Sequence, residues 1–378
     1  MDETVNLLVD LSHERFGARA LAEALRTLEA GGFSVTRTAG AGDAALAWVD
    51  EEFGGTWSSE VYAGKAIVAT FGDAFAGFAA YGARGLRFRW LRGLASRERV
   101  GIFGPFGVAK NFRGTCAGPQ LLIAALASLR EEGYTSALIP AVGEEKLIAY
   151  YVKHAGANIA ERFDKGQWQS VRYRTTVLAS GNGSNFQSVL DGAAGGRLPL
   201  DVAALVTNNA SAYALKRGRA ARVPSIEALP WERATQTRAS YDARLLEAVQ
   251  KTQPDVVLLL GWMHVLDAAF VERFPELINI HPAYLPLDQR NDTVGMPDGS
   301  RIPAFRGAHA LRDALAAGVR WTGATAHRVT LNADRGSVLV RRPLAIASGE
   351  TAESLAARLH PLEHRVLGGG IMRWVYER

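Results

Sequence analysis

The sequence has a single cysteine, Cys116, among its 378 residues, so no disulfide can form within the chain. A chain without disulfides is compatible with a reducing compartment. No apolar run approaches the roughly 18 residues that a membrane span needs. The first residues, MDETVNLLVD, carry acids where a signal peptide has a basic flank. We therefore expect a cytoplasmic protein that does not engage a membrane.

The chain has only a small excess of positive charge. The chain has 43 Lys and Arg against 38 Asp and Glu, a formal net charge of +5 and a sequence pI of about 9.4. The densest basic segment is RGLRFRWLRGLASRER, residues 84–99, and the other arginines are scattered. This pattern does not favour a nucleic-acid surface, and small anionic ligands would explain the same excess. We expect no nucleic-acid partner, and we identify no metal site.

The length and composition indicate two globular domains. Hydrophobic residues make up 48% of the chain and charged residues 21%, which is typical of a folded protein. A chain of 378 residues exceeds what one hydrophobic core usually serves. The clearest seam is the polar segment RFDKGQWQSVRYRTT, residues 162–176. We place the domains at residues 1–172 and 173–378.

The second half alternates short apolar runs with helical patterns. Runs such as DVVLLLG (255–261) and LINIHP (277–282) are apolar throughout or nearly so, as strands covered on both faces must be. YDARLLEAVQKTQ (241–253) has a helical pattern. The alternation predicts an α/β fold with a doubly wound, mostly parallel, Rossmann-like sheet, in which ligands bind at the carboxyl ends of strands.

The first half has a different pattern. KAIVATFGDAFAGFAAYG (65–82) and VGIFGPFGVAK (100–110) are expected to form neighbouring antiparallel strands. PQLLIAALASLREEG (119–133) is expected to form a helix, with proline in its first turn and Gly133 at its end. A strand at 134–142 and a helix at 146–157 follow. The first domain is therefore predicted to be α+β.

Polar residues at the ends of predicted strands in the second half are candidates for a site. Asn279 and His281 lie two apart in one strand and so face the same side. SGNGSN (180–185) joins a strand to a helix, where free N–H groups can bind an anion. Taken singly, a histidine at a strand end is more often structural than catalytic, and SGNGSN fits a plain turn as well as an anion site. Asp334, two residues before Gly336, is typical of a turn former.

The combination resembles a known family. The sequences TVLASGNGSNFQSVLD, PDVVLLLGWMHVL, INIHPAYLP, GATAHRVTLNADRGSVL and LEHRVL occur in the order and at roughly the spacing found in the folate-dependent formyltransferases. They are most similar to the glycinamide ribonucleotide formyltransferases, over about residues 175–375. The resemblance implies a catalytic triad, a substrate-phosphate loop, a pterin site and further substrate contacts. The implied catalytic triad is Asn279, His281 and Asp334, and the implied phosphate loop is Gly183, Ser184 and Asn185. The implied pterin site is Met263, Leu266 and the backbone around Leu331, and the implied further substrate contacts are His327 and Glu363.

Elementary chemistry agrees with these roles. An amine that attacks a formyl carbonyl places negative charge on the carbonyl oxygen, to which the amide of Asn279 can donate. A protonated His281 would add charge stabilisation, and Asp334 beside it would raise the imidazole pKa and steer proton transfer through water.

The second half also departs from that family in two places. The polar segment 287–304, LDQRNDTVGMPDGSRIPA, is longer than expected, and His264 stands where an arginine is expected. Both departures concern the amine substrate more than the chemistry. The GNGSN loop favours an acceptor with a phosphate or another anion. The family's transfer-RNA enzymes would carry a further C-terminal β-barrel, which we do not expect here.

The first half resembles the GNAT acyltransferases over roughly residues 40–165. The segment GIFGPFGVAKNFRGTCAGPQLLIAALASL (101–129) contains the loop that binds CoA pyrophosphate in that family, with Cys116 in place of a central glycine. The resemblance implies acetyl-CoA as a second cofactor and Tyr151 as general acid. The CoA-binding positions are Val108, Arg113, Gly114 and Gly118. Tyr150 and Tyr151 fit equally well as core aromatics. A domain that has kept the fold and lost CoA is the alternative.

Three functions follow from the sequence. The first is a bifunctional acyl-transfer enzyme that formylates a small-molecule amine with 10-formyltetrahydrofolate and also acts as a CoA-dependent N-acyltransferase. The second is a purine-pathway glycinamide ribonucleotide formyltransferase with a non-catalytic GNAT-like domain. The third is a non-catalytic regulator that binds folate or CoA. The oligomeric state is left open, a homodimer included.

Overall fold

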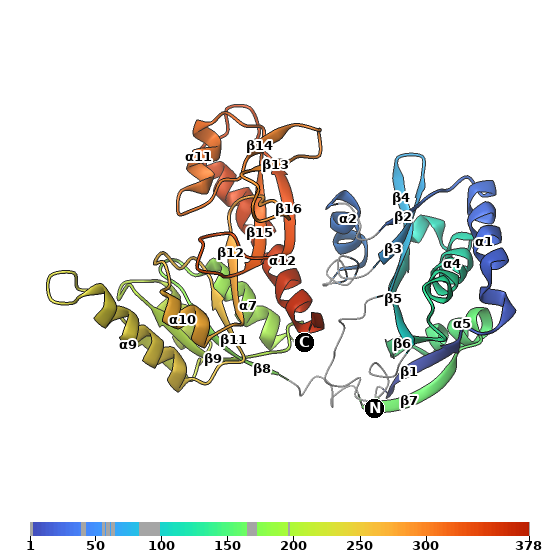
Figure 1. Cartoon of the computed structure of the whole chain (residues 1–378), viewed down its shortest axis with the longest axis horizontal. Helices are drawn as coiled ribbons and strands as arrows, with labels where there is room; N and C mark the ends of the chain where they lie inside the picture. Colours follow the sequence, from blue (N-terminus) through green and yellow to red (C-terminus); the bar gives the residue numbers. More distant parts are fainter. Residues whose placement is uncertain are drawn as a thin grey trace. The chain divides into compact units, whose positions relative to one another are not determined.

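A computed structural model gives the fold (Figure 1). The chain divides into two compact units, Met1–Val171 together with Met372–Arg378, and Arg172–Ile371. The basic segment at 84–99 lies outside the described residues apart from Arg99. The structure describes residues 3–38, 43–54, 57, 61, 65–82, 99–164, 172–195 and 197–377.

The first unit is built on a seven-stranded sheet with the order β2-β3-β4-β5-β6-β1-β7. The antiparallel pairing of β3, β4 and β5 confirms the prediction for these segments, and β5 and β6 pair in parallel. The strands are β1 (Glu3–Asp10), β2 (Ser34–Thr38), β3 (Lys65–Phe71), β4 (Ala74–Tyr81), β5 (Val100–Val108), β6 (Ser136–Val142) and β7 (Asn158–Asp164). The helices are α1 (Ala18–Ala30), α2 (Asp43–Phe53), α4 (Ala117–Glu131) and α5 (Glu145–Ala155).

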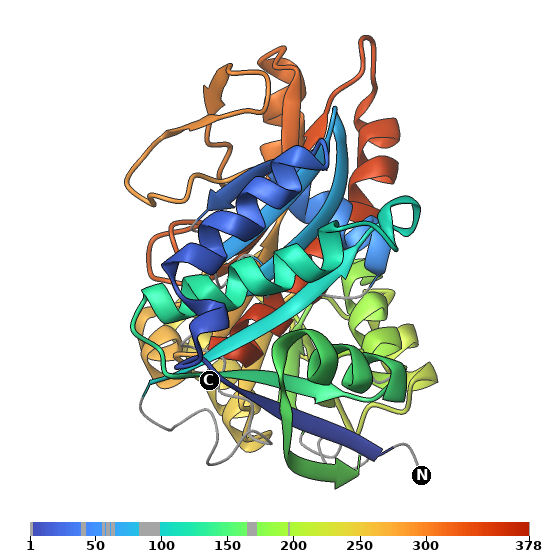
Figure 2. The same cartoon turned by 90° about the vertical axis from the view of Figure 1, so that its right-hand side faces the viewer.

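Side chains of this sheet alternate between two hydrophobic cores. In β3, Ile67 and Ala69 belong to the core shared with α1 and α4, whereas Ala66 and Val68 belong to the core shared with α2. Helices α1 and α4 lie side by side across one face of the sheet (Figure 2). Both faces of the sheet are therefore covered here, which explains why β3 and β4 are nearly continuous in apolar residues.

The second unit contains another seven-stranded sheet, with the order β10-β9-β8-β11-β12-β15-β16. The first five strands in this order are parallel, and β15 and β16 are antiparallel to their neighbours. This confirms the α/β, mostly parallel prediction for the second half. The strands are β8 (Tyr173–Leu178), β9 (Leu200–Thr207), β10 (Ser225–Ala228), β11 (Val256–Leu259), β12 (Leu277–His281), β15 (Trp321–Arg328) and β16 (Val338–Ala345).

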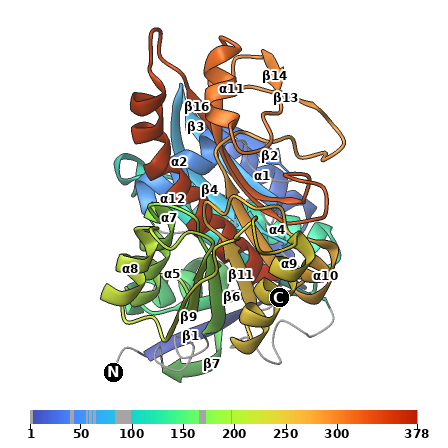
Figure 3. The same ribbon diagram turned by 90° about the vertical axis from the view of Figure 1, so that its left-hand side faces the viewer.

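Helices cover both faces of this sheet, so the fold is doubly wound. Helices α9 and α10 lie on one side and α7 and α8 on the other (Figure 3). In the described parts of the chain, no helix combines the length and the apolar character needed to cross a membrane. The helices are α7 (Ser184–Ala194), α8 (Ala214–Ala220), α9 (Arg238–Lys251), α10 (Ala268–Arg273), α11 (Ala310–Ala316) and α12 (Ala352–Glu377).

The order of the parallel strands creates a ligand-binding edge. The chain passes from β8 outward to β9 and β10, then returns to β11 on the opposite side of β8. The loops after β8 and β11 therefore lead to helices on opposite faces of the sheet. The carboxyl edge where they diverge is where doubly wound sheets bind ligands. The two loops are joined by hydrogen bonds, from the Ser180 amide to the Gly261 carbonyl at 3.2 Å and from the Met263 amide to Ser180 Oγ at 3.0 Å.

The polar segment 287–304 contains a hairpin of β13 (Thr293–Gly295) and β14 (Arg301–Pro303). Val294, Met296 and Ile302 are buried in a small core with Tyr284. The segment is thus a folded part of the unit, with its own apolar contacts, and not an extended loop.

Candidate active site

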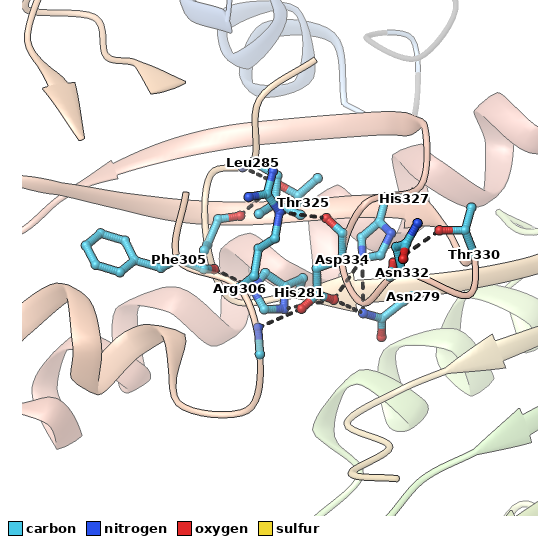
Figure 4. A network of polar contacts seen from close by, with 12 residues as sticks. Asn279, His281, Leu285, Phe305, Arg306, Thr325, His327, Thr330, Asn332 and Asp334 are labelled. Carbon is cyan, nitrogen blue, oxygen red and sulfur yellow. Dashed lines mark hydrogen bonds and ion pairs between the residues drawn. The ribbon is translucent and has the colours of Figure 1, made fainter. Parts of the chain in front are cut away.

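Strand β12 presents two polar side chains at its carboxyl end. Asn279 and His281 lie two apart in the strand and share a face. In the antiparallel pairing with β15, Asn279 lies opposite His327 and His281 lies opposite Thr325. The register therefore places a carboxamide and two imidazoles together, as Figure 4 shows.

Asp334 joins this group from the loop between β15 and β16. Its Oδ1 lies 3.4 Å from Asn279 Nδ2, 3.5 Å from His281 Nδ1 and 3.5 Å from His327 Nε2 (Figure 4). Its Oδ2 accepts a hydrogen bond of 2.7 Å from the Gly307 amide. The structure thus brings Asn279 and His281 into contact with the carboxylate of Asp334.

Two residues of the loop that carries Asp334 suit its unusual backbone conformation. Asp334 has φ of 53°, in the left-handed region that aspartate tolerates better than most residues. Gly336 passes so close to β15 that a Cβ there would lie 1.5 Å from the Arg328 carbonyl oxygen. Only glycine fits at position 336. Gly336 therefore allows the loop to approach β15 closely, and Asp334 lies in this loop.

Hydrogen bonds to main-chain carbonyls determine which ring nitrogens carry protons. His281 Nε2 lies 2.7 Å from the Phe305 carbonyl and His327 Nδ1 lies 2.8 Å from the Arg328 carbonyl. A carbonyl can only accept, so each of these nitrogens donates. In a neutral ring the other nitrogen is an acceptor. Asn279 Nδ2 lies 3.1 Å from His327 Nε2.

The pKa of His281 differs from the expectation drawn from the sequence. Burial lowers the pKa of His281, and this outweighs the raising effect of Asp334 and of the Phe305 carbonyl. His281 is 4% exposed, and a pKa below the ordinary 6.5 makes the imidazole mainly neutral at pH 7. Burial acts to raise the pKa of Asp334, but the contact with His327, the attraction to the protonated form of His281 and the Gly307 amide hold it far below its ordinary value. The carboxylate is therefore the fixed charge of the site.

The Gly-rich loop forms the start of α7. Gly183 has φ of 74°, and a Cβ there would lie 2.9 Å from the Ala214 side chain, so glycine is required on both counts. Arg217 fastens the loop, donating from Nε to the Asn182 carbonyl at 2.9 Å and from Nη2 to Asn182 Oδ1 at 2.9 Å. Helix α7 begins at Ser184, and first-turn N–H groups of a helix lack partners within it.

Glu363 of α12 meets Asn185 of α7. Asn185 Nδ2 donates to Glu363 Oε2 at 3.2 Å, and among the described residues Asn185 Oδ1 has no hydrogen-bond partner. The two side chains are 9% and 6% exposed, respectively. Burial raises the pKa of Glu363 to about 7, with the Asn185 hydrogen bond acting in the opposite direction. This carboxyl is the group of the site that titrates near neutral pH.

Glu363→Gln is expected to stabilise the protein in alkaline solution. The folded-state pKa of about 7 exceeds the ordinary 4.5, so the folded state holds the proton more tightly. Stability contributed by this proton is complete below about pH 4.5 and is lost as the pH rises through 7. The loss approaches about 3 kcal/mol. Urea unfolding of both proteins at pH 5 and pH 8 should show similar midpoints at pH 5 and a higher midpoint for the variant at pH 8. Parallel pH dependence would contradict the assignment.

The predicted pterin positions have different exposures. Met263 is 55% exposed and Leu331 is 53% exposed, whereas Leu266 is 7% exposed and packs in the core of the unit. Val265, which the sequence analysis did not select, is 66% exposed. Exposed apolar side chains beside β12 suit a flat aromatic ligand. His264 instead contacts the Tyr241 hydroxyl at 3.3 Å.

The candidate residues of the first unit lie around the start of α4. Arg113 Nε donates to the Val108 carbonyl at 3.1 Å, and Gly114 has φ of 84°. A Cβ on Gly118 would lie 3.1 Å from the Tyr150 hydroxyl. Tyr151 is 7% exposed and its ring contacts Phe103 and Phe106, and burial raises the pKa of its hydroxyl. Its role as general acid stays a prediction.

The interactions of the site include residues that the sequence analysis did not select. They are Phe305 and Gly307, which contact His281 and Asp334, and Arg306, whose Nε donates to the Asp334 carbonyl at 3.3 Å. Their only sequence signal is their position at the end of the unusual polar segment.

A carboxamide, two imidazoles and an ionised carboxylate at the carboxyl edge of a doubly wound sheet define a class of site that suits group transfer at a carbonyl. Comparison with known proteins specifies the class further. Residues 173–287 and 298–369 match the formyl transferase family model. The chain belongs to the formyl transferase family.

Individual relatives are similar over the same half of the chain. The phosphoribosylglycinamide formyltransferase of Escherichia coli K12 is 31% identical over 191 residues, which cover 50% of this chain and 81% of that protein. The protein of the same name from Mycobacterium tuberculosis is 33% identical over 199 residues, which cover 51% and 81%. Among solved structures, glycinamide ribonucleotide transformylase 1 of Symbiobacterium toebii is 34% identical, with a TM-score of 0.46 and coverage of 53% and 86%.

Proposed function

We propose that the protein transfers the formyl group of 10-formyltetrahydrofolate to the amine of a small molecule that carries a phosphate. The observation that supports this most strongly is the meeting of three side chains: Asn279 Nδ2 and His281 Nδ1 both lie within 3.5 Å of Asp334 Oδ1. Because relatives are named phosphoribosylglycinamide formyltransferase, glycinamide ribonucleotide is the first acceptor to test.

The donor supplies a formyl group on its N10 nitrogen. The acceptor nitrogen bonds to the formyl carbon, and the bond from that carbon to N10 then breaks. One proton leaves the acceptor amine and one reaches N10, so a hydrogen and a formyl group exchange places. Asn279 donates to the carbonyl oxygen as charge develops there, in place of its long 3.4 Å contact with Asp334.

Proton movement is assigned to the pair of His281 and Asp334. A carboxylate whose pKa lies far below its ordinary range is a poor base, so Asp334 acts mainly through its charge. Neutral His281 keeps the lone pair of Nδ1, which lies 3.5 Å from Asp334 Oδ1. We assign His281, acting through water, as the acceptor of the amine proton, with Asp334 stabilising the imidazolium.

The acceptor is assigned to the loop between β8 and α7. Helix α7 offers the free N–H groups of Ser184 and Asn185 to a phosphate. Glu363 and the unpartnered Oδ1 of Asn185 offer buried oxygen atoms to hydroxyl or amine hydrogens. In this assignment, the anion of the acceptor binds at α7 and its amine lies toward β12.

The test is incubation of the protein with 10-formyltetrahydrofolate and a panel of amines, with products identified by mass spectrometry. Glycinamide ribonucleotide should gain one CO unit, and the same compound without its phosphate should react much more slowly. Equal reaction of both would contradict the assignment of the loop. Binding of the donor without turnover of any amine would favour the regulatory alternative.

CoA binding by the first unit is a second proposal. Strands β5 and β6 pair in parallel over Val100–Ile102 and Ser136–Leu138, and β5 continues to Val108 before the loop that leads to α4. Diverging parallel strands beside a helix start can admit an extended ligand with a pyrophosphate. Calorimetric titration with CoA should show binding that Arg113→Ala weakens by about tenfold. Absence of CoA binding would contradict this second proposal.

A further inference from the structure

The hairpin segment carries an aspartate that contacts two arginines of the active-site loops. Asp292 Oδ1 accepts from Arg306 Nη1 at 2.9 Å and from Arg335 Nη2 at 2.5 Å. Main-chain carbonyls complete the contacts. Arg306 Nη2 donates to the Asn291 carbonyl at 2.8 Å, and Arg335 Nη1 donates to the Gln289 carbonyl at 2.8 Å.

Both arginines adjoin the residues that hold the catalytic groups. Arg306 lies between Phe305, whose carbonyl accepts from His281, and Gly307, whose amide donates to Asp334. The Nε of Arg306 also donates to the Asp334 carbonyl, at 3.3 Å (Figure 4). Arg335 directly follows Asp334. One carboxylate in the hairpin is therefore connected to both segments that fix His281 and Asp334.

The hairpin segment is also where this chain departs from its family. The match to the formyl transferase model stops at residue 287 and resumes at residue 298, so Asp292 lies in the unmatched stretch. The carboxylate and carbonyl oxygens that these arginines contact thus lie in a stretch that the family model does not match.

We propose that Asp292 is a positioning residue, which holds Arg306 and Arg335 so that Asp334 keeps its left-handed backbone and its place beside His281. The catalytic consequence rests on the proposed formyl transfer. A non-glycine residue at φ of 53° persists only where its surroundings determine it. The four arginine hydrogen bonds to the hairpin segment and the one to the Asp334 carbonyl are part of those surroundings.

The exposure of these side chains determines what the contact does. The Asp292 side chain is 73% exposed, that of Arg335 is 34% exposed and that of Arg306 is 14% exposed. Ion pairs with such an exposed partner contribute little to stability. A displacement of about 1 Å in a catalytic group, however, can reduce a rate by about 100-fold. Loss of Asp292 should therefore affect turnover and leave folding nearly unchanged.

Asp292→Asn is expected to lower kcat by about tenfold, with KM and the thermal midpoint nearly unchanged. Asp292→Glu, which keeps the charge, should restore part of the rate. The matched control is Asp288→Asn, which removes the same charge from the same segment but breaks only the exposed pair of Asp288 with Arg290. Equal kcat in the Asp292→Asn and Asp288→Asn variants would overturn the proposal.

A second measurement does not depend on activity. The groups that face His281 are Asp334, His327, Arg306 and the Phe305 carbonyl, and of these Asp334 and the carbonyl raise its pKa. If Asp334 moves away in Asp292→Asn, the pKa of His281 falls further, whereas in Asp288→Asn it stays. NMR titration of the histidine signals, with His281→Asn for assignment, reads this directly.

The two experiments separate the two claims. A fall in the His281 pKa in a protein that formylates no amine would support the positioning role and count against the proposed function. An unchanged His281 pKa in an active Asp292→Asn variant with normal kcat would overturn the positioning role and leave the proposed function intact.

Discussion

Asn279→Ala is expected to lower kcat for formyl transfer by about 100- to 1,000-fold, the range found when a single donor to a developing oxyanion is removed. The amide is the one donor on β12 that points at the site and is not bound to a main-chain carbonyl. Its removal leaves His281 and Asp334 in contact with each other, so donor and acceptor should still bind. The measurement is steady-state kinetics with a folding control by circular dichroism.

A matched variant guards against a trivial explanation. Asn332→Ala removes an exposed asparagine side chain from the loop that carries Asp334, and the contacts described for Asn332 use its main-chain carbonyl. Its kcat should equal that of the wild type. Comparable losses in the two variants would mean that the loop tolerates no change, and the specific role of Asn279 would be lost.

Asp334→Asn is expected to lower kcat by about 100- to 10,000-fold, because it neutralises the charged partner of a proton-transferring group. Asparagine accepts the left-handed backbone as well as aspartate does, so φ of 53° should survive the change. The missing charge withdraws the main influence that raises the pKa of His281, which should fall further.

Kinetics over a range of pH and NMR titration of His281 check this prediction together. The expected combination is a low rate at every pH and a lower imidazole pKa. A variant that keeps its rate would show that proton transfer does not need this carboxylate. An unchanged His281 pKa would show that the two groups are farther apart in solution than 3.5 Å.

Much of the second unit could be predicted from the sequence because its signals are local. Apolar runs give strands, helical periods give helices, and Asn279 and His281 two apart in a strand must share a face. The Asp334 contact could not be derived from spacing alone. It depends on the close approach of Gly336 to β15, and only the family resemblance connected these distant segments.

The errors and omissions have tertiary causes. Strand β1 received no assignment in the sequence analysis, yet it lies inside its sheet between β6 and β7, and this pairing joins residues more than 120 positions apart. The pKa of His281 was expected to rise because a carboxylate was expected nearby. The degree of burial that reverses the shift is a property of the folded unit. Asp292 was one acid in a polar segment, and its contacts with Arg306 and Arg335 appear only after folding.

The most direct measurement follows the formyl carbon itself. A donor labelled with ¹³C in its formyl group is incubated with glycinamide ribonucleotide and either wild-type protein or Asn279→Ala, and the ¹³C signal is observed by NMR. We predict that the wild type moves the label into a formamide of the acceptor and that the variant leaves it on the donor. A label that stays on the donor with the wild type, or that the variant transfers as quickly, would contradict the account.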